Sequence, residues 1–211
     1  MSSTVPQRKG EVTRAAILDA ALKLAGSAGI DALTIGVLAQ LTGMSKSGVF
    51  AHFGSREELQ IAVVNEYQHR FQQAVFEAAM QEPRGLPRLQ ALLDNWITLS
   101  THEISQGCIF MSGAFEYDDR PGPVRDALVS AYGSWRGALE RACSQAIEHG
   151  HIRAETDAEQ LIFELTGLVL VLHHDARFLR EPHALERVRR GMRRLIDACS
   201  TPLAANLETH R

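Results

Sequence analysis

The sequence predicts an all-α protein in which a small N-terminal helical domain is joined by a long helix to a larger C-terminal helical domain. Apolar residues recur with the 3.6-residue period of a helix in nearly every segment, and no stretch alternates as a strand does. Gly and Pro clusters interrupt this pattern at intervals. With 211 residues the chain can hold two small domains with a core. We expect domains at 1–56 and 57–201, followed by a disordered tail at 202–211.

Composition narrows the class of protein. The 45% apolar and 22% charged content is ordinary for a soluble globular chain. Residues 1–10 are polar and do not resemble a signal peptide. The longest apolar run, 161–172, contains Glu164 and is too short to span a bilayer. Three cysteines, an odd number and widely spaced, are typical of reduced thiols. We therefore expect a cytoplasmic protein without a membrane partner.

The first helix is expected at residues 13–28, after a mobile arm at 1–12. Gly29 is suited to end this helix, and Leu33 in the following connection is expected to fill the same small core. The helix carries an apolar stripe made of Ile17, Leu18, Ala21, Leu24, Ala25 and Ala28.

Two short helices joined by a tight turn are predicted within residues 34–56. Gly43 supplies the permissive backbone that the turn needs, and Ser45 is a good N-cap for the second helix. Val49 and Phe53 lie four residues apart on one side of that helix. The first of the two helices has the apolar positions Ile35, Leu38, Ala39 and Leu41. This spacing is typical of a helix-turn-helix, although an ordinary helical hairpin would also show it.

The second helix of the pair is expected to carry Ser45, Lys46, Ser47 and Phe50 outward. Short polar and basic side chains on a helix suit a DNA groove. Charge supports this interpretation, because residues 1–56 carry six basic and three acidic residues, a net +3, which leaves −6 for residues 57–211. Arg8 and Lys9 in the arm, together with Arg14 just after it, are candidates for phosphate or minor-groove contact, unless the arm is merely a solvated tail.

The remaining chain is predicted to be helical throughout. Residues 55–58 form a capping box that opens a long helix to about Gln81, and 156–159 form a second capping box. The long helix has apolar positions at Leu59, Ala62, Val63, Tyr67, Phe71, Ala74, Val75 and Ala78. Further helices are expected at 87–102, 108–117, 123–149, 157–179 and 182–199. The helix at 157–179 is apolar nearly all round, so we expect it to be buried in the body or against a partner.

The segment from residue 13 to residue 59, TRAAILDAALKLAGSAGIDALTIGVLAQLTGMSKSGVFAHFGSREEL, resembles the DNA-binding domain of the TetR family of bacterial transcriptional regulators. The resemblance implies a three-helix DNA-binding domain and a helical ligand-binding and dimerisation domain. It implies a repressor, not an enzyme, that binds a palindromic operator in double-stranded DNA as a homodimer and is released by a small-molecule effector. The last two long helices would form the dimer. We expect no cofactor.

The resemblance assigns DNA contacts residue by residue. Thr34 is expected to cap the first helix of the pair, and the resemblance implies that it also hydrogen-bonds a phosphate. Ser45 and Lys46 would approach phosphates or base edges at the positive end of the second helix. Phe50 stands where the family usually has a tyrosine, so the phosphate contact of a hydroxyl is replaced by apolar contact. The complete set of candidates is Thr34, Ser45, Lys46, Ser47, Gly48, Phe50, His52 and Arg56.

The body offers candidates for effector binding and dimerisation, although residues of these types are more often plain core. The candidate ligand-binding residues are Trp96, Ser100, Phe110, Met111, Phe115, Tyr132, Trp135, Phe163 and His173, with Tyr117, His102 and Glu116 as further candidates. The candidate dimerisation residues are Leu161, Leu165, Leu168, Val169, Leu172, Leu185, Val188, Met192 and Leu195.

Other chemistries find less support in the sequence. His173 and His174 are adjacent, so on a helix their side chains point about 100° apart and do not chelate as an i, i+4 pair does. We therefore expect no metal. Cys108, predicted at a helix start, is either an activated thiol or a buried apolar residue. A helical small-molecule-binding or redox-sensing protein with no DNA role is the alternative hypothesis.

Overall fold

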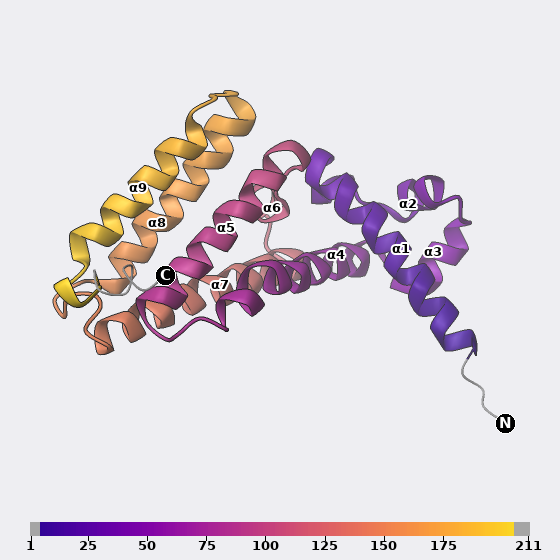
Figure 1. Cartoon of the computed structure of the whole chain (residues 1–211). Helices are drawn as coiled ribbons and strands as arrows, with labels where there is room; N and C mark the ends of the chain where they lie inside the picture. Colours follow the sequence, from indigo (N-terminus) through magenta and orange to yellow (C-terminus); the bar gives the residue numbers. More distant parts are fainter. Residues whose placement is uncertain (1–4, 205–211) are drawn as a thin grey trace. The chain divides into compact units, whose positions relative to one another are not determined.

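The structure, a computed structural model, describes residues 5–204 and the side chains from Lys9 onward. The α-helices, labelled in Figure 1, are α1 (Val5–Ala28), α2 (Ile35–Thr42), α3 (Lys46–Phe53), α4 (Arg56–Phe71), α5 (Leu86–Gln106), α6 (Ile109–Tyr117), α7 (Pro123–Glu148), α8 (Ala158–His173) and α9 (Ala184–Cys199). A 3₁₀ turn, η1, spans Ile30–Ala32, and two π-helical segments, η2 and η3, span Gln72–Glu77 and His174–Phe178. Between residues 5 and 204 the β-structure is limited to one isolated bridge, which joins Ile152 to Ser200. The predicted all-α fold is confirmed.

The described chain forms two compact units. The first unit contains the chain up to Arg70 together with Gln106–Ala131, and the second contains Phe71–Ser105 together with the chain from Tyr132 onward. Compactness therefore assigns α4 and α6 to the same unit as the helix-turn-helix. The boundary expected at residue 56 separates DNA binding from ligand binding and dimerisation, not one compact unit from another, and it stays a prediction. Of the helices described in residues 5–204, none is long and apolar enough to cross a membrane.

The first unit is built on α1, which is longer than predicted. It begins at Val5 instead of Thr13, and the Thr13 hydroxyl donates to the carbonyl of Lys9 (3.0 Å) as an interior helix residue does. The prediction of a mobile arm was therefore wrong for the residues after Thr4, and residues 1–4 lie outside the described chain. The expected helix end at Gly29 is confirmed by its φ of 87°. The core of this unit includes Ile17, Ala21, Ala25, Leu33, Leu38, Val49, Phe53, Leu59 and Val63.

The long helix that follows Ser55 changes its winding partway along. Regular α4 ends at Phe71 and continues as the π-helical segment η2, after which the helical backbone ends near Ala79. A π-turn takes up more residues than an α-turn and so rotates the later side chains. Ala74 and Ala78, predicted on the apolar face, are therefore exposed, whereas Val75, predicted on the same face, is buried together with Ala79.

The second unit consists of η2, α5, most of α7, α8, η3 and α9, and α8 and α9 lie side by side (Figure 1). The start of α8 differs from the predicted capping box, because Asp157 and not Thr156 is the N-cap and accepts a hydrogen bond from the backbone N–H of Gln160 (3.0 Å). Residues 202–204, predicted to belong to a disordered tail, form a helical turn in which Ala204 is buried. The rest of that predicted tail lies outside the described residues.

Candidate nucleic-acid interface and interior cluster

The helix-turn-helix forms as predicted because each of its ends has a cap. Thr34 Oγ1 accepts a hydrogen bond from the backbone N–H of Val37 (3.1 Å) and opens α2. Gly43, in the left-handed region with φ 66°, closes α2 and makes the turn. Ser45 Oγ then accepts from the backbone N–H of Gly48 (3.1 Å) and opens α3. Two short helices are thus held at a fixed turn by side chains that the sequence alone identified.

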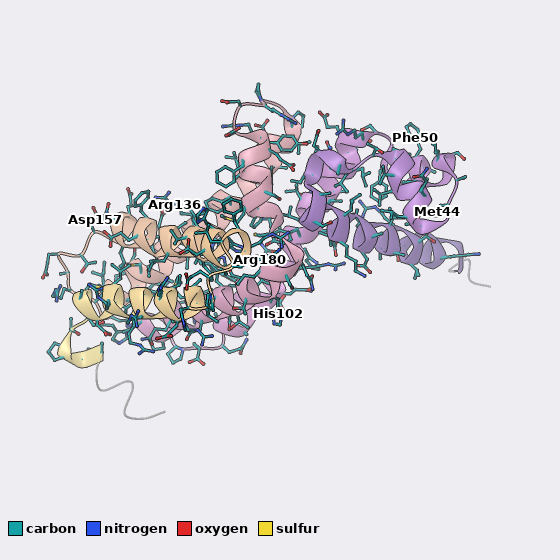
Figure 2. All side chains as sticks on the ribbon, turned by 90° about the horizontal axis from the view of Figure 1, so that it is seen from above. Met44, Phe50, His102, Arg136, Asp157 and Arg180 are labelled. Carbon is teal, nitrogen blue, oxygen red and sulfur yellow. The ribbon has the colours of Figure 1, made fainter. Side chains whose placement is uncertain are left out.

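One side of α3 is exposed and the other is core. Val49 and Phe53 are buried, whereas Lys46, Ser47 and Phe50 are exposed. Phe50, which is 55% exposed, stands at the outer surface of this unit (Figure 2). This confirms the predicted outward direction of these side chains.

An apolar residue of α2 was placed wrongly by its periodicity. Leu41 was predicted to belong to the apolar face of α2, but its side chain is 57% exposed, whereas Leu38 and Ala39 are buried. The buried part of this short helix is therefore narrower than the 3.6-residue pattern suggested.

Arg56, a candidate for phosphate binding, is already occupied within the first unit. Its Nε donates to the carbonyl of Leu33 (3.1 Å), and its Nη2 donates to the carbonyl of Asp31 and to Asp31 Oδ1 (2.8 Å). Arg120 approaches the same carboxylate at 3.5 Å. Arg56 therefore holds the connection between α1 and α2 in place. The guanidinium of Arg14, another candidate, lies 5.1 Å from the centre of the Phe53 ring.

A second group of contacts fixes η1, the turn that leads into α2. Glu116 Oε2, from α6, accepts hydrogen bonds from the backbone N–H groups of Ile30 (2.8 Å) and Asp31 (3.2 Å). The buried Gln60, from α4, donates its Nε2 to the carbonyl of Ile30 (3.1 Å). Sequence reasoning placed Glu116 in a ligand pocket, and nothing in the sequence shows that a residue 86 positions away caps this turn.

The close packing of α6 against α1 depends on glycine. Gly107 has φ 94°, and a Cβ built there would lie 1.6 Å from the carbonyl oxygen of Gly26. A Cβ on Gly26 would in turn meet the carbonyl oxygen of Gln106 at 2.7 Å. The loop before α6 can therefore approach the end of α1 only with glycine at these positions.

The second unit contains a cluster of aromatic and polar side chains in its interior. The rings of Trp96 (α5) and Trp135 (α7) meet edge-on with centroids 5.3 Å apart, and Phe71 meets Trp135 in the same manner at 4.9 Å. Ser100 lies one turn after Trp96 on α5, and Trp135 and Ser100 are both buried. Four predicted ligand residues, namely Trp96, Ser100, Trp135 and His173, are buried in this unit.

The polar end of this cluster is made by Glu103 (α5) and His173 (α8). Both side chains are buried, and His173 Nε2 lies 3.8 Å from Glu103 Oε2, which is too long for a hydrogen bond. Burial, with a smaller contribution from the charge of Arg177, lowers the pKa of His173 from 6.5 to about 4. The imidazole is therefore neutral near pH 7.

The other predicted ligand residues do not belong to this cluster. Phe110 and Met111 belong to the first unit, where the Phe110 ring packs edge-on against Tyr67 at 4.6 Å. Phe115 and Phe163 are 76% and 61% exposed, so they cannot line an interior site. Tyr132 is half-buried on α7, and His102 is exposed.

Most of the predicted dimerisation residues pack inside the chain. Their side chains fill the contact between α8 and α9 and the core next to it, because each helix turns its apolar stripe inward. The buried members of that set are Leu161, Leu165, Val169, Leu172, Val188 and Met192, and the half-buried members are Leu168, Leu185 and Leu195. The exposed apolar side chains of α8 and η3 are different residues: Phe163, Leu170, Val171 and Phe178.

A groove of about 840 Å³ also runs along the second unit between α5 and α9. Charges of both signs line it, with Arg189 and Arg193 on α9 and Asp94 on α5 among them. None of the predicted ligand residues lines this groove. It therefore does not coincide with the interior cluster.

A capped helix-turn-helix with one exposed helix side, followed by a helical body, defines the class of helix-turn-helix DNA-binding regulators. Comparison with protein families makes this specific. The model for "Bacterial regulatory proteins, tetR family" matches residues 17–63, and that for "Tetracyclin repressor-like, C-terminal domain" matches residues 85–192. The chain belongs to the TetR family of DNA-binding transcriptional regulators, as its sequence predicts.

Solved structures agree on the fold. A TetR-family regulator from Cytophaga hutchinsonii is 20% identical, with a TM-score of 0.77 over 92% of this chain and 97% of that chain. A regulator from Chloroflexus aurantiacus is 23% identical, with a TM-score of 0.71 over 90% and 95%. AibR, solved in complex with isovaleryl coenzyme A and operator DNA, is 25% identical, with a TM-score of 0.65 over 85% and 95%. No curated protein matches the chain in sequence.

Proposed function

We propose that this regulator is a homodimeric repressor that binds a palindromic operator through α3 and leaves it when a small molecule binds in the second unit. The observation that carries the proposal is the exposed side of α3, where Lys46, Ser47 and Phe50 project from a helix fixed by two caps. A structural relative, AibR, was solved with an acyl-CoA ligand and operator DNA, which supports the combination of effector and DNA in one chain.

At the DNA, each exposed group has a separate role. Lys46, in the first turn of α3, is placed for a phosphate or a guanine edge, and Ser47 adds a short donor. The Thr34 hydroxyl accepts from Val37, so its own hydrogen remains available to donate to a phosphate. Phe50 offers apolar contact to a thymine methyl group. Arg56 acts through the connection before α2, which it holds in place.

The dimer is proposed to form through the exposed side of α8. Phe163, Leu170 and Val171 recur at helical spacing on that side, and Phe178 extends it into η3. Gly167 lies among them, and a Cβ there would meet nothing within 4 Å. A second α8 could therefore approach closely at Gly167, as a twofold interface requires.

The exposed side of α9 is unsuited to an apolar contact. It carries Arg187, Arg189, Arg190, Arg193 and Arg194. The exposed acids of α8, Glu159 and Glu164, provide opposite charge for such arginines across a twofold axis. The twofold axis would set two α3 helices on half-sites about 34 Å apart, or a multiple of that distance.

Effector binding is proposed to act by a population shift. The chain passes between the two units at residues 70–71, 105–106 and 131–132, and all three positions lie inside helices. A ligand that favours one arrangement of these helices lowers operator affinity about 5- to 150-fold for a coupling of ~1–3 kcal/mol.

The DNA contact is tested by gel retardation of fragments from around the coding region, over a range of salt concentrations. Lys46→Ala should weaken binding roughly tenfold and reduce the slope of log affinity against log salt by about 1, because one phosphate contact is lost. Lys23→Ala, which removes an exposed lysine from α1, is the matched control and should bind like the parent. Failure of the parent to retard any fragment at low salt would argue against the repressor.

The dimer contact is tested by sedimentation of a matched pair of glycine variants. Gly167→Trp should convert the dimer to a monomer with its helical circular dichroism intact, because the added ring meets only the partner. Gly133→Trp, on α7 with equally open space, should remain dimeric. A Gly167→Trp protein that sediments as the parent does would remove α8 from the interface.

A further inference from the structure

Two buried polar side chains in the second unit have no hydrogen-bond partner among the described residues. They are the hydroxyl of Ser100, whose residue is fully buried, and the indole N–H of Trp135, whose residue is 6% exposed. Buried polar groups are nearly always hydrogen-bonded, because the loss of hydration without a new partner is costly. A pair of such groups in one unit calls for a partner from outside the chain.

These two groups belong to one structural cluster. Trp96 connects them, because its ring packs edge-on against Trp135 at 5.3 Å and Ser100 follows it by one turn on α5. Glu103 continues the same side of α5 and approaches His173 at 3.8 Å. The cluster thus has aromatic rings, two polar groups without a partner among the described residues, and a polar end on α8.

The polar groups specify the chemistry of a partner. An indole N–H only donates, so Trp135 needs an acceptor, and the Ser100 hydroxyl can donate to the same atom or accept from a hydroxyl. A buried anion is costly without a paired cation, and the buried side chain of Glu103 does not supply one. Arg177, whose charge contributes to the lowered pKa of His173, already donates its Nη1 to the carbonyl of Ile104 (2.8 Å). The aromatic rings of Trp96 and Trp135 favour a ligand with a flat apolar body.

We propose that the effector is an uncharged aromatic compound with a carbonyl or hydroxyl oxygen, bound against the rings of Trp96 and Trp135 with that oxygen on Trp135 Nε1 and Ser100 Oγ. The inference rests on the proposed function, because it identifies the class of molecule that the second unit binds.

Three naphthalenes of nearly the same shape test the chemistry: 2-acetylnaphthalene, 2-ethylnaphthalene and 2-naphthoate. Titration calorimetry with the full chain should give the ketone a dissociation constant below about 1 mM and roughly tenfold tighter binding than the hydrocarbon. The carboxylate should bind more weakly than the ketone. Equal binding of ketone and hydrocarbon, tighter binding of the carboxylate, or no binding of the ketone would overturn the proposal.

Variants locate the ketone within the cluster. Trp135→Phe keeps an aromatic ring and Ser100→Ala removes only a hydroxyl, so each should fold and each should lower ketone affinity about five- to tenfold. Affinity for 2-ethylnaphthalene should stay unchanged. Thr101→Ala is the matched control, because the Thr101 hydroxyl already donates to the carbonyl of Ile97 (2.8 Å). Unchanged ketone affinity in both test variants would show that the oxygen binds elsewhere.

A spectroscopic readout comes from the protein itself. The chain has two tryptophans, and both belong to this cluster. Ketone binding should therefore change their fluorescence in the parent protein, and an unchanged spectrum at saturation would contradict the proposed site. These measurements contain no DNA, so a protein that binds the ketone but retards no DNA refutes the repressor and leaves the site standing. A protein that retards DNA but does not bind the ketone refutes the proposed ligand site and leaves the repressor standing.

Discussion

The turn before α2 and the interior of the second unit handle buried polar groups in opposite ways. Around η1 the polar groups are paired within the unit: Gln60 donates to Ile30, and Glu116 accepts from Ile30 and Asp31. In the second unit Ser100 and Trp135 are buried without a partner among the described residues.

This difference matches two different tasks. A DNA-reading helix must keep one position, which a closed hydrogen-bond network provides without any ligand. A ligand-sensing interior gains from groups that become satisfied only when the ligand arrives, because that supplies differential binding between two states. The polar groups around η1 therefore have their hydrogen-bond partners in the folded chain. The interior cluster can select a ligand because two of its polar groups still need a partner.

The largest effect is expected from breaking the glycine contact that seats α6 on α1. Gly107→Ala places a Cβ 1.6 Å from a carbonyl oxygen at a residue with φ 94°, so the loop must move. We expect a loss of at least about 3 kcal/mol in the free energy of unfolding, since strain and a backbone clash add together. Urea unfolding followed by circular dichroism measures this loss.

Gly133→Ala gives the matched control for that variant. Gly133 lies inside α7 in open space, so alanine should raise the free energy of unfolding by up to about 1 kcal/mol through helix propensity. If Gly107→Ala is as stable as the parent, the close seating of α6 is not required for the fold.

Much of the first unit could be predicted from the sequence because its signals are local. Thr34, Gly43 and Ser45 act on residues three or four positions away, and so their roles could be read from spacing alone. The roles of Glu116 and Arg56 depend on contacts 86 and 23 residues apart, which no local pattern encodes. The π-helical segments were missed for a related reason, since their extra residue breaks the period that identified the helix.

In the second unit the helix positions could be predicted, but the direction of each side chain could not. An apolar run such as 161–172 has no polar side to orient it, so Leu165 and Leu170 look alike in sequence. The structure buries Leu165 against the chain's own core and exposes Leu170. For the same reason, the exposed Phe163 was predicted to line a ligand pocket, and residues that are buried in the chain were predicted to form the dimer surface.

Acid should destabilise the second unit through His173. The pKa of His173 in the folded chain, about 4, lies below the ordinary value of 6.5. Between these pH values His173 is therefore protonated in the unfolded chain but not in the folded chain. Stability is therefore full above pH 6.5 and falls as the pH drops toward 4, by about 2–3 kcal/mol from this group. Burial also lowers the pKa of His151, whose Nδ1 accepts from the backbone N–H of Leu86 (3.2 Å), so it acts in the same direction.

Urea unfolding at pH 7.5 and pH 4.5 measures this dependence. His173→Gln should reduce the difference between the two pH values by about 2 kcal/mol, because it removes the titrating group. His174→Gln, at the exposed neighbouring position, should keep the parent's difference. An unaltered pH dependence in His173→Gln would mean that another group dominates acid unfolding.

The smallest effect is expected from removing the carboxylate that caps η1. Glu116→Ala leaves the N–H groups of Ile30 and Asp31 without their acceptor, which should lower the free energy of unfolding by about 1–2 kcal/mol. Glu140→Ala is the control, because it removes only a surface ion pair with Arg136 on the same helix and should cost about 0.3–0.5 kcal/mol. Since η1 leads directly into α2, the loss in Glu116→Ala should also weaken DNA retardation, whereas Glu140→Ala should bind DNA as the parent does. Equal stability and equal DNA binding in the two variants would show that the closed network around η1 contributes no more than a surface ion pair.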